Sequence, residues 1–250
     1  MRHIRHRAAA LLTLLTMAGP AQGAPATIQL EPKNVDVSLF FNGTTVKIRG
    51  TVPPGRKVAV VCRGEDQKLE LKKKGKVWGV LWMNTAEVTF EHLPALYLAS
   101  TSAPLAGLAS FEVRRQLGVG YRALAARTKG EAAADFGELT KLKEAEGMYV
   151  QREGAVKLRP VAGALELEAE CHIPARAPIG TYRVEVFGFE GKQGARLASR
   201  SFSLAKVGLA RFITSLAETR GLLYGIFVVV VAIVMGLLTG LVFGLKGKAH

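Results

Sequence analysis

The chain has few of the residues from which catalytic and metal sites are usually built. Its 250 residues include two cysteines and five histidines, and of the histidines only His92 and His172 lie away from the ends. The patterns Gly-x-Ser-x-Gly and His-Glu-x-x-His and a phosphate-binding glycine loop are all missing from the sequence. We therefore predict a protein that is not an enzyme and uses no cofactor.

Acidic residues are also scarce. There are 20 Asp and Glu against 34 Lys and Arg, a formal net charge of +14. A chain this basic suits anionic lipid headgroups, acidic glycans or an acidic face of another protein. Nucleic acid is not expected as a partner, because the ends of the chain predict export.

The N-terminus predicts a secretory signal peptide. Three arginines precede an apolar run from Ala8 to Ala18, which is too short to cross a bilayer. Small residues before Ala24 predict cleavage after Gly23, so that residues 1–23 are removed and the net charge falls from +14 to +11. An uncleaved membrane anchor is the alternative.

The C-terminus predicts a membrane span. Leu222 to Leu245 holds no charged residue and is long enough, as a helix, to cross about 30 Å of hydrocarbon. We expect a transmembrane helix over residues 221–245 and a cytoplasmic tail over residues 246–250, whose Lys246 and Lys248 fit the positive-inside rule. The predicted location is the bacterial inner membrane, with the bulk of the chain in the periplasm.

Residues 24–205 predict one periplasmic domain that is mainly β. About nine or ten short strand-like segments at regular spacing favour a β-sandwich. Pro178 to Val186 is typical of a late strand in immunoglobulin-like sandwiches, where a tyrosine, here Tyr182, bonds back to the backbone. The region from about residue 104 to residue 147 is rich in helix formers, which predicts a helical insertion of two or three helices. The predicted fold is an immunoglobulin-like β-sandwich with a helical insertion and one C-terminal transmembrane helix.

Two hairpins are predicted in this domain. Asn42-Gly43 is a strong signal for a two-residue hairpin turn. A second hairpin is expected from Leu69 to Met83, with its turn at Lys74-Gly75.

The second hairpin carries lysines and two tryptophans. A solvated, aggregation-blocking turn is one interpretation of the lysines, and docking to an acidic headgroup or partner is the other. Trp78 and Trp82 stand four apart in a predicted strand, share a face and are expected to pack in the core. The lysines of this predicted basic surface are Lys72, Lys73, Lys74 and Lys76.

The two cysteines end strand-like runs and are a candidate disulfide. Cys62 ends a run that is apolar on both faces, which predicts a central strand, and Cys171 ends a run in which glutamates alternate with apolar residues. In an oxidising compartment a bond between them closes about 110 residues, for which chain entropy gives about 4 to 5 kcal/mol at most. Two unbonded thiols are the alternative.

A metal site is a second use for the same residues. Cys62, His92, Cys171 and His172 are ligand types that copper(I) accepts. Adjacent strand residues point to opposite faces, however, so Cys171 and His172 are not expected to bind one ion. We therefore predict no metal.

The predicted span carries small residues along one side. Small residues let two helix backbones approach closely in lipid, which predicts packing on a second copy or on a multi-span permease. A chance pattern in a glycine-rich span is the alternative. Residues 206–220, just before it, predict a juxtamembrane amphipathic helix. The small residues are Gly225, Ala232, Gly236, Gly240 and Gly244.

Several motifs resemble those of a known family. They are Gly75 to Asn84, Pro94 to Ser100, Lys141 to Tyr149, Pro178 to Val186 and Lys206 to Ile213. Over nearly the whole mature chain the sequence is similar to the putative transmembrane protein family first described in alphaproteobacteria. The resemblance implies an inner-membrane protein with a periplasmic domain and one C-terminal span. Genes of this family often lie beside sulfite exporter TauE/SafE-type permeases, which implies a transport accessory role.

Three hypotheses of function follow. The first is a non-enzymatic accessory subunit of a membrane transporter of the sulfite or organosulfur exporter type. The second is a stand-alone envelope module that binds glycan or protein and self-associates through its span. The third and least favoured is a periplasmic metal or redox protein that uses Cys62 and Cys171.

Overall fold

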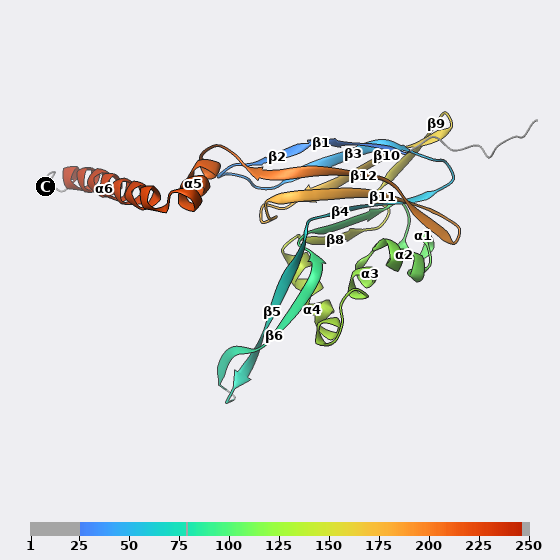
Figure 1. The fold of residues 1–250 in the computed structure, drawn as a ribbon, viewed down its shortest axis with the longest axis horizontal. Coiled ribbons are helices and arrows are strands. Elements are labelled where there is room, and N and C mark those ends of the chain that lie inside the picture. Colours follow the sequence, from blue (N-terminus) through green and yellow to red (C-terminus); the bar gives the residue numbers. More distant parts are fainter. Residues whose placement is uncertain (1–25, 79, 247–250) are drawn as a thin grey trace, which may run out of the picture.

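The computed structural model describes residues 26–78 and 80–246. They form a β-sandwich, a group of helices on one side of it, a projecting hairpin and a helical extension at the C-terminus (Figure 1). The fold is mainly β, as predicted. The predicted signal peptide, residues 1–23, and residues 247–250 of the predicted tail lie outside the described residues.

One sheet of the sandwich has four antiparallel strands. In β10 of this sheet Leu167, Ala169 and Cys171 are buried while Glu166 and Glu170 are exposed, as alternation predicts. The order across the sheet is β1 (Thr27–Glu31), β3 (Thr44–Val52), β10 (Ala164–Ile173) and β9 (Lys157–Val161).

The other sheet has six strands. Its order is β2 (Asn34–Val37), β12 (Gln193–Lys206), β11 (Gly180–Glu190), β4 (Lys57–Arg63), β7 (Tyr97–Thr101) and β8 (Tyr149–Arg152). The β2–β12 and β7–β8 pairs are parallel, and the remaining pairs are antiparallel. β4 lies in the interior of the sheet, which confirms the prediction of a central strand for a segment that is apolar on both faces.

The main core lies between the two sheets. Ile48 and Leu167 from the four-stranded sheet and Val60 and Val184 from the six-stranded sheet have almost no exposed surface. Each buried aliphatic side chain of this kind stabilises the fold by about 1.5 to 3 kcal/mol relative to an exposed one.

The insertion over residues 104–147 forms four short helices, where the sequence predicted two or three. Gly118 (φ +66°) adopts the left-handed conformation that ends α2, and Gly130 (φ +62°) has a positive φ outside the helical region just before α4. The helices cover the face of the six-stranded sheet that points away from the four-stranded sheet (Figure 1). They are α1 (Leu105–Leu108), α2 (Phe111–Leu117), α3 (Tyr121–Ala125) and α4 (Glu131–Ala145).

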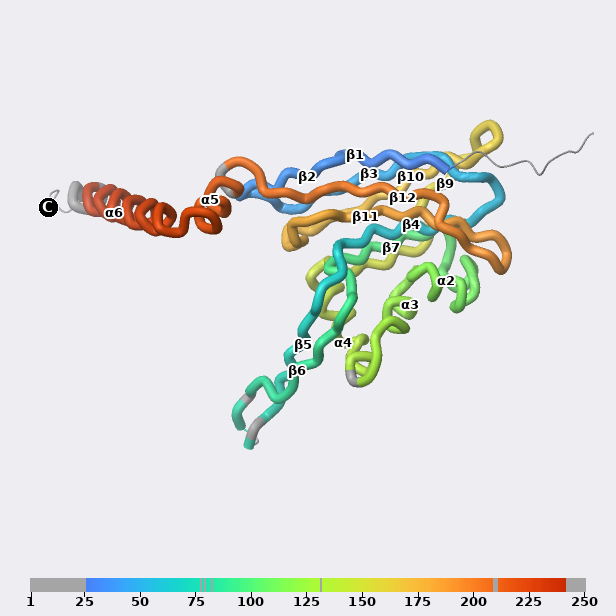
Figure 2. The backbone as a smooth tube through the Cα atoms, viewed as in Figure 1, coloured from blue at the N-terminus to red at the C-terminus, as the bar shows by residue number. Residues whose placement is uncertain are grey.

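The second predicted hairpin exists but is longer and turns elsewhere. β5 (Asp66–Val77) and β6 (Leu81–Pro94) pair as a separate two-stranded sheet that projects from the sandwich (Figures 1 and 2). Lys74-Gly75, the predicted turn, lies inside this ladder, where a register shift between Lys73 and Lys74 takes up the irregularity. Pairing along the whole hairpin outweighs the local turn preference of two residues.

Trp78 lies at the hairpin turn and is 90% exposed, so its predicted packing in the core is wrong. The prediction placed Trp78 inside a strand. Because the turn begins after Val77, Trp78 instead stands at the far end of the hairpin, beyond the reach of the sandwich. The burial of Trp82 lies outside what the structure describes.

The hairpin predicted at Asn42-Gly43 does not form. β2 and β3 flank these residues but belong to different sheets, since β2 pairs with β12 and β3 pairs with β1 and β10. Gly43 has φ +94° and packs against the backbone of Ile173. The Asn-Gly signal is purely local, whereas the burial of two strands on opposing sheets decides the path of the chain.

The C-terminal segment forms two helices. α5 (Gly208–Thr219) stands where the juxtamembrane helix was predicted, and α6 (Gly221–Lys246) stands where the span was predicted. Gly221–Leu241 has a mean hydropathy of 2.7 and no buried residue, so α6 is long and apolar enough to cross a membrane. Arg220, which is not helical, separates the two helices.

Tyr182 of β11 forms the tyrosine corner that the sequence predicted. Its hydroxyl donates to the carbonyl oxygen of Pro178, and its ring stacks on Phe202 of β12 with centroids 5.3 Å apart. Burial raises the pKa of Tyr182, so the hydroxyl keeps its proton and remains a donor. This contact is a hallmark of immunoglobulin-like sandwiches.

Tyr182→Phe removes this hydrogen bond and keeps the ring. We expect the free energy of unfolding to fall by about 1 kcal/mol, because one buried hydrogen bond is lost. Urea denaturation in detergent, followed by circular dichroism, measures the change. Tyr224→Phe on α6 is the matched control and should have no effect on the sandwich; an equal loss in both variants would contradict the assignment.

Candidate functional site

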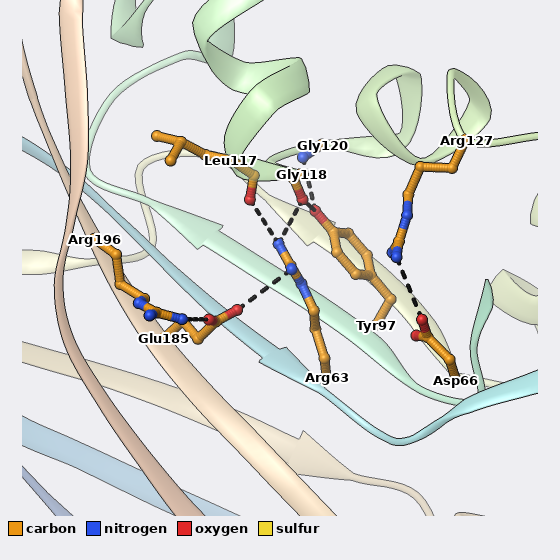
Figure 3. Close-up of polar contacts among 9 residues, drawn as sticks. All are labelled: Arg63, Asp66, Tyr97, Leu117, Gly118, Gly120, Arg127, Glu185 and Arg196. Carbon is orange, nitrogen blue, oxygen red and sulfur yellow. Dashed lines mark hydrogen bonds and ion pairs between the residues drawn. The ribbon is translucent and has the colours of Figure 1, made fainter. Parts of the chain in front are cut away.

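A cluster of charged and aromatic side chains lies where α2 and α3 meet the six-stranded sheet (Figure 3). Three adjacent strands supply it: Glu185 comes from β11, Arg63 from β4 and Tyr97 from β7. Arg63 points toward the helices because Cys62, its neighbour in the strand, points into the sandwich.

Arg63 binds the C-terminal end of α2. Its Nη2 donates to the carbonyl oxygens of Leu117 (2.9 Å) and Gly118 (2.8 Å), at a helix end that leaves carbonyls without intrahelical partners. Ser110 begins the helix by accepting a hydrogen bond from the backbone N–H of Val113. A Cβ atom at Gly118 would lie 2.9 Å from Arg63 Nη2, so only glycine allows this approach.

Glu185 is buried and held by two arginines. Its Oε2 lies 3.3 Å from Arg63 Nη1, and its Oε1 lies 2.8 Å from Arg196 Nη1 of β12. A buried carboxylate is costly unless it is paired and hydrogen-bonded. The pairing therefore ties the centre of the sheet to the end of α2.

Tyr97 completes the contact between sheet and helices. Its hydroxyl donates to the carbonyl oxygen of Gly118 (3.0 Å) and accepts from the N–H of Gly120 (2.7 Å). Burial raises the pKa of Tyr97 to about 12, which keeps the phenol neutral. The Arg63 guanidinium also lies 5.9 Å from the ring centroids of Tyr97 and Phe187, within the range of cation–π attraction.

This cluster borders a cleft of about 380 Å³. Arg127 Nη2 lies 3.3 Å from Asp66 Oδ2 on one side of it (Figure 3). The Nε–H of Arg63 is buried and has no hydrogen-bond partner among the residues that the structure describes. Arginine donors and carboxylate acceptors can hold a polar ligand here. The lining residues are Arg63, Gly64, Glu65, Asp66, Arg127, Thr181, Arg183 and Glu185.

The sequence did not predict this cluster. Arg63 and Glu185 each stand next to strand residues that are buried on both faces, Val58–Cys62 and Val186–Phe189. The available signal was the charged residue itself at the border of a buried run, because a charged side chain there needs an oppositely charged or hydrogen-bonding partner. Which partner it finds depends on the helices that cover the sheet.

Cys62 and Cys171 meet across the sandwich, from β4 of one sheet and β10 of the other. Both are buried free thiols in the structure. The hydrogen bond with Cys171, followed by burial, raises the pKa of Cys62. A thiol with a raised pKa is a poor nucleophile and a poor metal ligand near neutral pH.

The two histidines of the copper hypothesis do not face the space between the cysteines. His172 is exposed on the opposite face of β10, where its Nδ1 lies 3.2 Å from Thr45 Oγ1. His92 lies on β6 and lines a different cleft, together with Arg127 and Lys129. Within residues 26–78 and 80–246, no three His, Cys, Asp or Glu side chains gather as a metal site would require.

The predicted basic surface lies along β5, where all four lysines are exposed. Lys73 makes an ion pair with Asp135 of α4, with Nζ 2.6 Å from Oδ1. This pair joins the middle of the hairpin to the helical insertion. The lysines are Lys72, Lys73, Lys74 and Lys76.

The small-residue side of α6 is uncovered in the structure. No atom lies within 4 Å of the position that a Cβ would take at Gly225, Gly236 or Gly240, and Ala232 is exposed. The surroundings of Gly244 lie outside what the structure describes. Four of the five predicted packing residues are thus open to a second helix.

A comparison with known protein families places the chain beside one of them. The model of a family described as putative transmembrane protein (Alph_Pro_TM) matches residues 26–244. The matched range takes in the sandwich, the helical insertion, the hairpin, α5 and nearly all of α6. No curated protein matches the chain.

Arg63→Met should detach α2 from the sheet. It removes both bonds to α2 and one of the two partners of buried Glu185, so we expect the free energy of unfolding to fall by about 3 kcal/mol. Amide hydrogen exchange should rise most in α2 and α3. Arg183→Met, an exposed residue of the same cleft, is the control and should change stability by less than about 0.5 kcal/mol. Unchanged exchange in α2 would contradict the role of Arg63.

Protein exported to an oxidising compartment should carry a Cys62–Cys171 disulfide, because the two buried thiols already face each other. Mass spectrometry after alkylation, on protein isolated from membranes without reductant, counts the free thiols. We expect none, and we expect reduction to lower the free energy of unfolding by up to about 4 to 5 kcal/mol. Two alkylated thiols after unfolding without reductant would show that no bond forms.

Proposed function

This chain belongs to the family of putative transmembrane proteins (Alph_Pro_TM), and we propose that it is a non-enzymatic accessory subunit of a membrane transporter. In this proposal residues 24–205 face the periplasm after export and α6 crosses the bacterial inner membrane. The partner is a multi-span permease of the sulfite or organosulfur exporter type. The sandwich then sits beside the permease and binds a solute or a second protein.

The uncovered small-residue side of α6 is the observation that carries the proposal. A lone span surrounded by lipid has no packing use for Gly225, Gly236 and Gly240, and glycine lowers helix stability relative to alanine. Against a second helix the same residues permit close backbone contact. The small residues are therefore best accounted for by a helical partner.

The surface of the sandwich supports a binding role. Its polar cleft is lined by arginines and carboxylates that are already paired with one another, such as Arg127 with Asp66. Paired groups of this kind hold and orient a ligand, whereas acid–base or nucleophilic catalysis calls for a group with a shifted pKa in contact with the substrate.

A stand-alone envelope module is the second candidate, and the same cleft favours it. About 380 Å³ lined by Arg63, Arg127 and Arg183 with three carboxylates suits the hydroxyl groups of a glycan or a polar loop of a protein. The metal or redox hypothesis has the least support, because the raised pKa of Cys62 disfavours a thiolate, His92 lines a separate cleft and His172 is on the exposed face of β10, opposite Cys171.

Affinity purification of the full chain in mild detergent, followed by mass spectrometry, tests the proposal. We expect a multi-span permease in stoichiometric amount, and we expect Gly240→Ile to lower its yield about tenfold, the effect of losing about 1.4 kcal/mol of helix packing. Leu238→Phe is the matched control, because Leu238 lies about 160° around the helix from both Gly236 and Gly240.

Two outcomes would contradict the accessory role. Recovery of the chain alone, as monomer or dimer, would favour the stand-alone module. Equal losses with Gly240→Ile and Leu238→Phe would mean that the small-residue side of α6 is not the contact.

A further inference from the structure

We propose that the distal part of the β5–β6 hairpin, residues 71–86, is a second membrane contact that docks on anionic lipid headgroups of the bilayer that α6 crosses. This part is called the hairpin tip below. The inference needs only a membrane-spanning α6 and is independent of the identity of any protein partner.

The hairpin tip projects from the sandwich beyond Leu71, which packs against the core, and Lys73, which pairs with Asp135. β5 and β6 pair with each other as a separate two-stranded sheet. At the base of the hairpin Val88, Phe90 and Leu93 are buried in the core, whereas residues 72–74 and 83–87 are exposed. The Lys73–Asp135 ion pair braces the hairpin where this exposed part begins. The hairpin is thus anchored at one end and open at the other.

The far end of the hairpin is apolar. Trp78 is 90% exposed and Val80 is 83% exposed, and Leu81 and Met83 are about half exposed. Tryptophan is enriched at membrane–water interfaces, where its ring contacts lipid and its N–H contacts water.

The same stretch is basic throughout. From Leu71 to Ala86 there are four lysines and no Asp or Glu. Lys74 is exposed and stands between the braced part of the hairpin and its apolar end, and Lys72, also exposed, stands next to the bracing Lys73, opposite Glu87 in the ladder. An apolar end flanked by lysines is the composition by which peripheral segments bind anionic bilayers, since the apolar side chains insert and the lysines meet headgroup phosphates.

The orientation of the hairpin agrees with this contact. It leaves the sandwich toward the end of the molecule where α5 and α6 lie, and its tip ends about level with α5 along the long axis (Figures 1 and 2). If α6 crosses the bilayer, α5 lies at the surface on the side of the sandwich. The hairpin tip therefore reaches the same surface, and two contacts would hold the sandwich at one orientation to the membrane.

The tryptophans make the test direct. Trp78 and Trp82 are the two tryptophans of the chain, so intrinsic fluorescence reports on the hairpin tip alone. Full-length protein is reconstituted into vesicles of phosphatidylcholine, with or without phosphatidylglycerol in both leaflets. We expect blue-shifted emission, protection from acrylamide and quenching by brominated lipid in the anionic vesicles. Trp82→Phe leaves Trp78 as the single reporter.

Reversing the charge of two lysines makes the experiment quantitative. Each lysine near an anionic surface favours the docked state about fivefold, so Lys72→Glu with Lys74→Glu should lower the ratio of docked to undocked hairpin by about 30-fold or more. Lys33→Glu with Lys192→Glu changes the net charge equally at exposed sites away from the hairpin and should leave the emission as in the wild type.

Two results would overturn the proposal. One is emission typical of indole in water, with full access to acrylamide, in both kinds of vesicle. The other is protection that arises only after a co-purified multi-span protein is added, which would make the hairpin tip a protein contact. Either result leaves the role of α6 as a span untouched, so the two proposals fail separately.

Discussion

The six-stranded sheet is covered on both faces, by the four-stranded sheet on one side and by the helical insertion on the other. The middle of its central strand β4, Val58 to Cys62, is therefore buried on both faces, and a charged residue that borders it, such as Arg63, needs a partner. Arg63 meets this requirement by binding Glu185 and the end of α2 at the same time. That attachment joins α2 to the sheet and forms one wall of the polar cleft.

Two exposed regions lie at or toward the end of the molecule that α6 forms. One is the small-residue side of α6, and the other is the hairpin tip with its exposed Trp78. A soluble domain seldom exposes apolar groups in this way without a partner. Since family membership and α6 make this a membrane protein, lipid and the helices of membrane proteins are the partners that fit these surfaces.

The buried polar groups of the domain, in contrast, stabilise the fold. Tyr182 and Tyr97 are held as neutral phenols by burial, and the thiol of Cys62 is held protonated by its neighbour and by burial. Tyr182 forms the tyrosine corner, Tyr97 joins the sheet to the helices, and Cys62 lies against Cys171 of the other sheet.

The sequence alone determined the parts that depend on local pattern. The apolar length of α6, the alternation in β10, the two-faced apolar character of β4 and the helical insertion each follow from composition and periodicity within one segment. Tertiary structure alone decided which segments meet. It placed β2 and β3 in different sheets despite the turn signal at Asn42-Gly43. It extended the second hairpin beyond Lys74-Gly75, so that Trp78 is exposed at the turn, and it paired Arg63 with Glu185. The reason is physical: a turn preference or a single charge is worth about 1 kcal/mol or less locally, whereas the burial of whole strand faces is worth many times that amount.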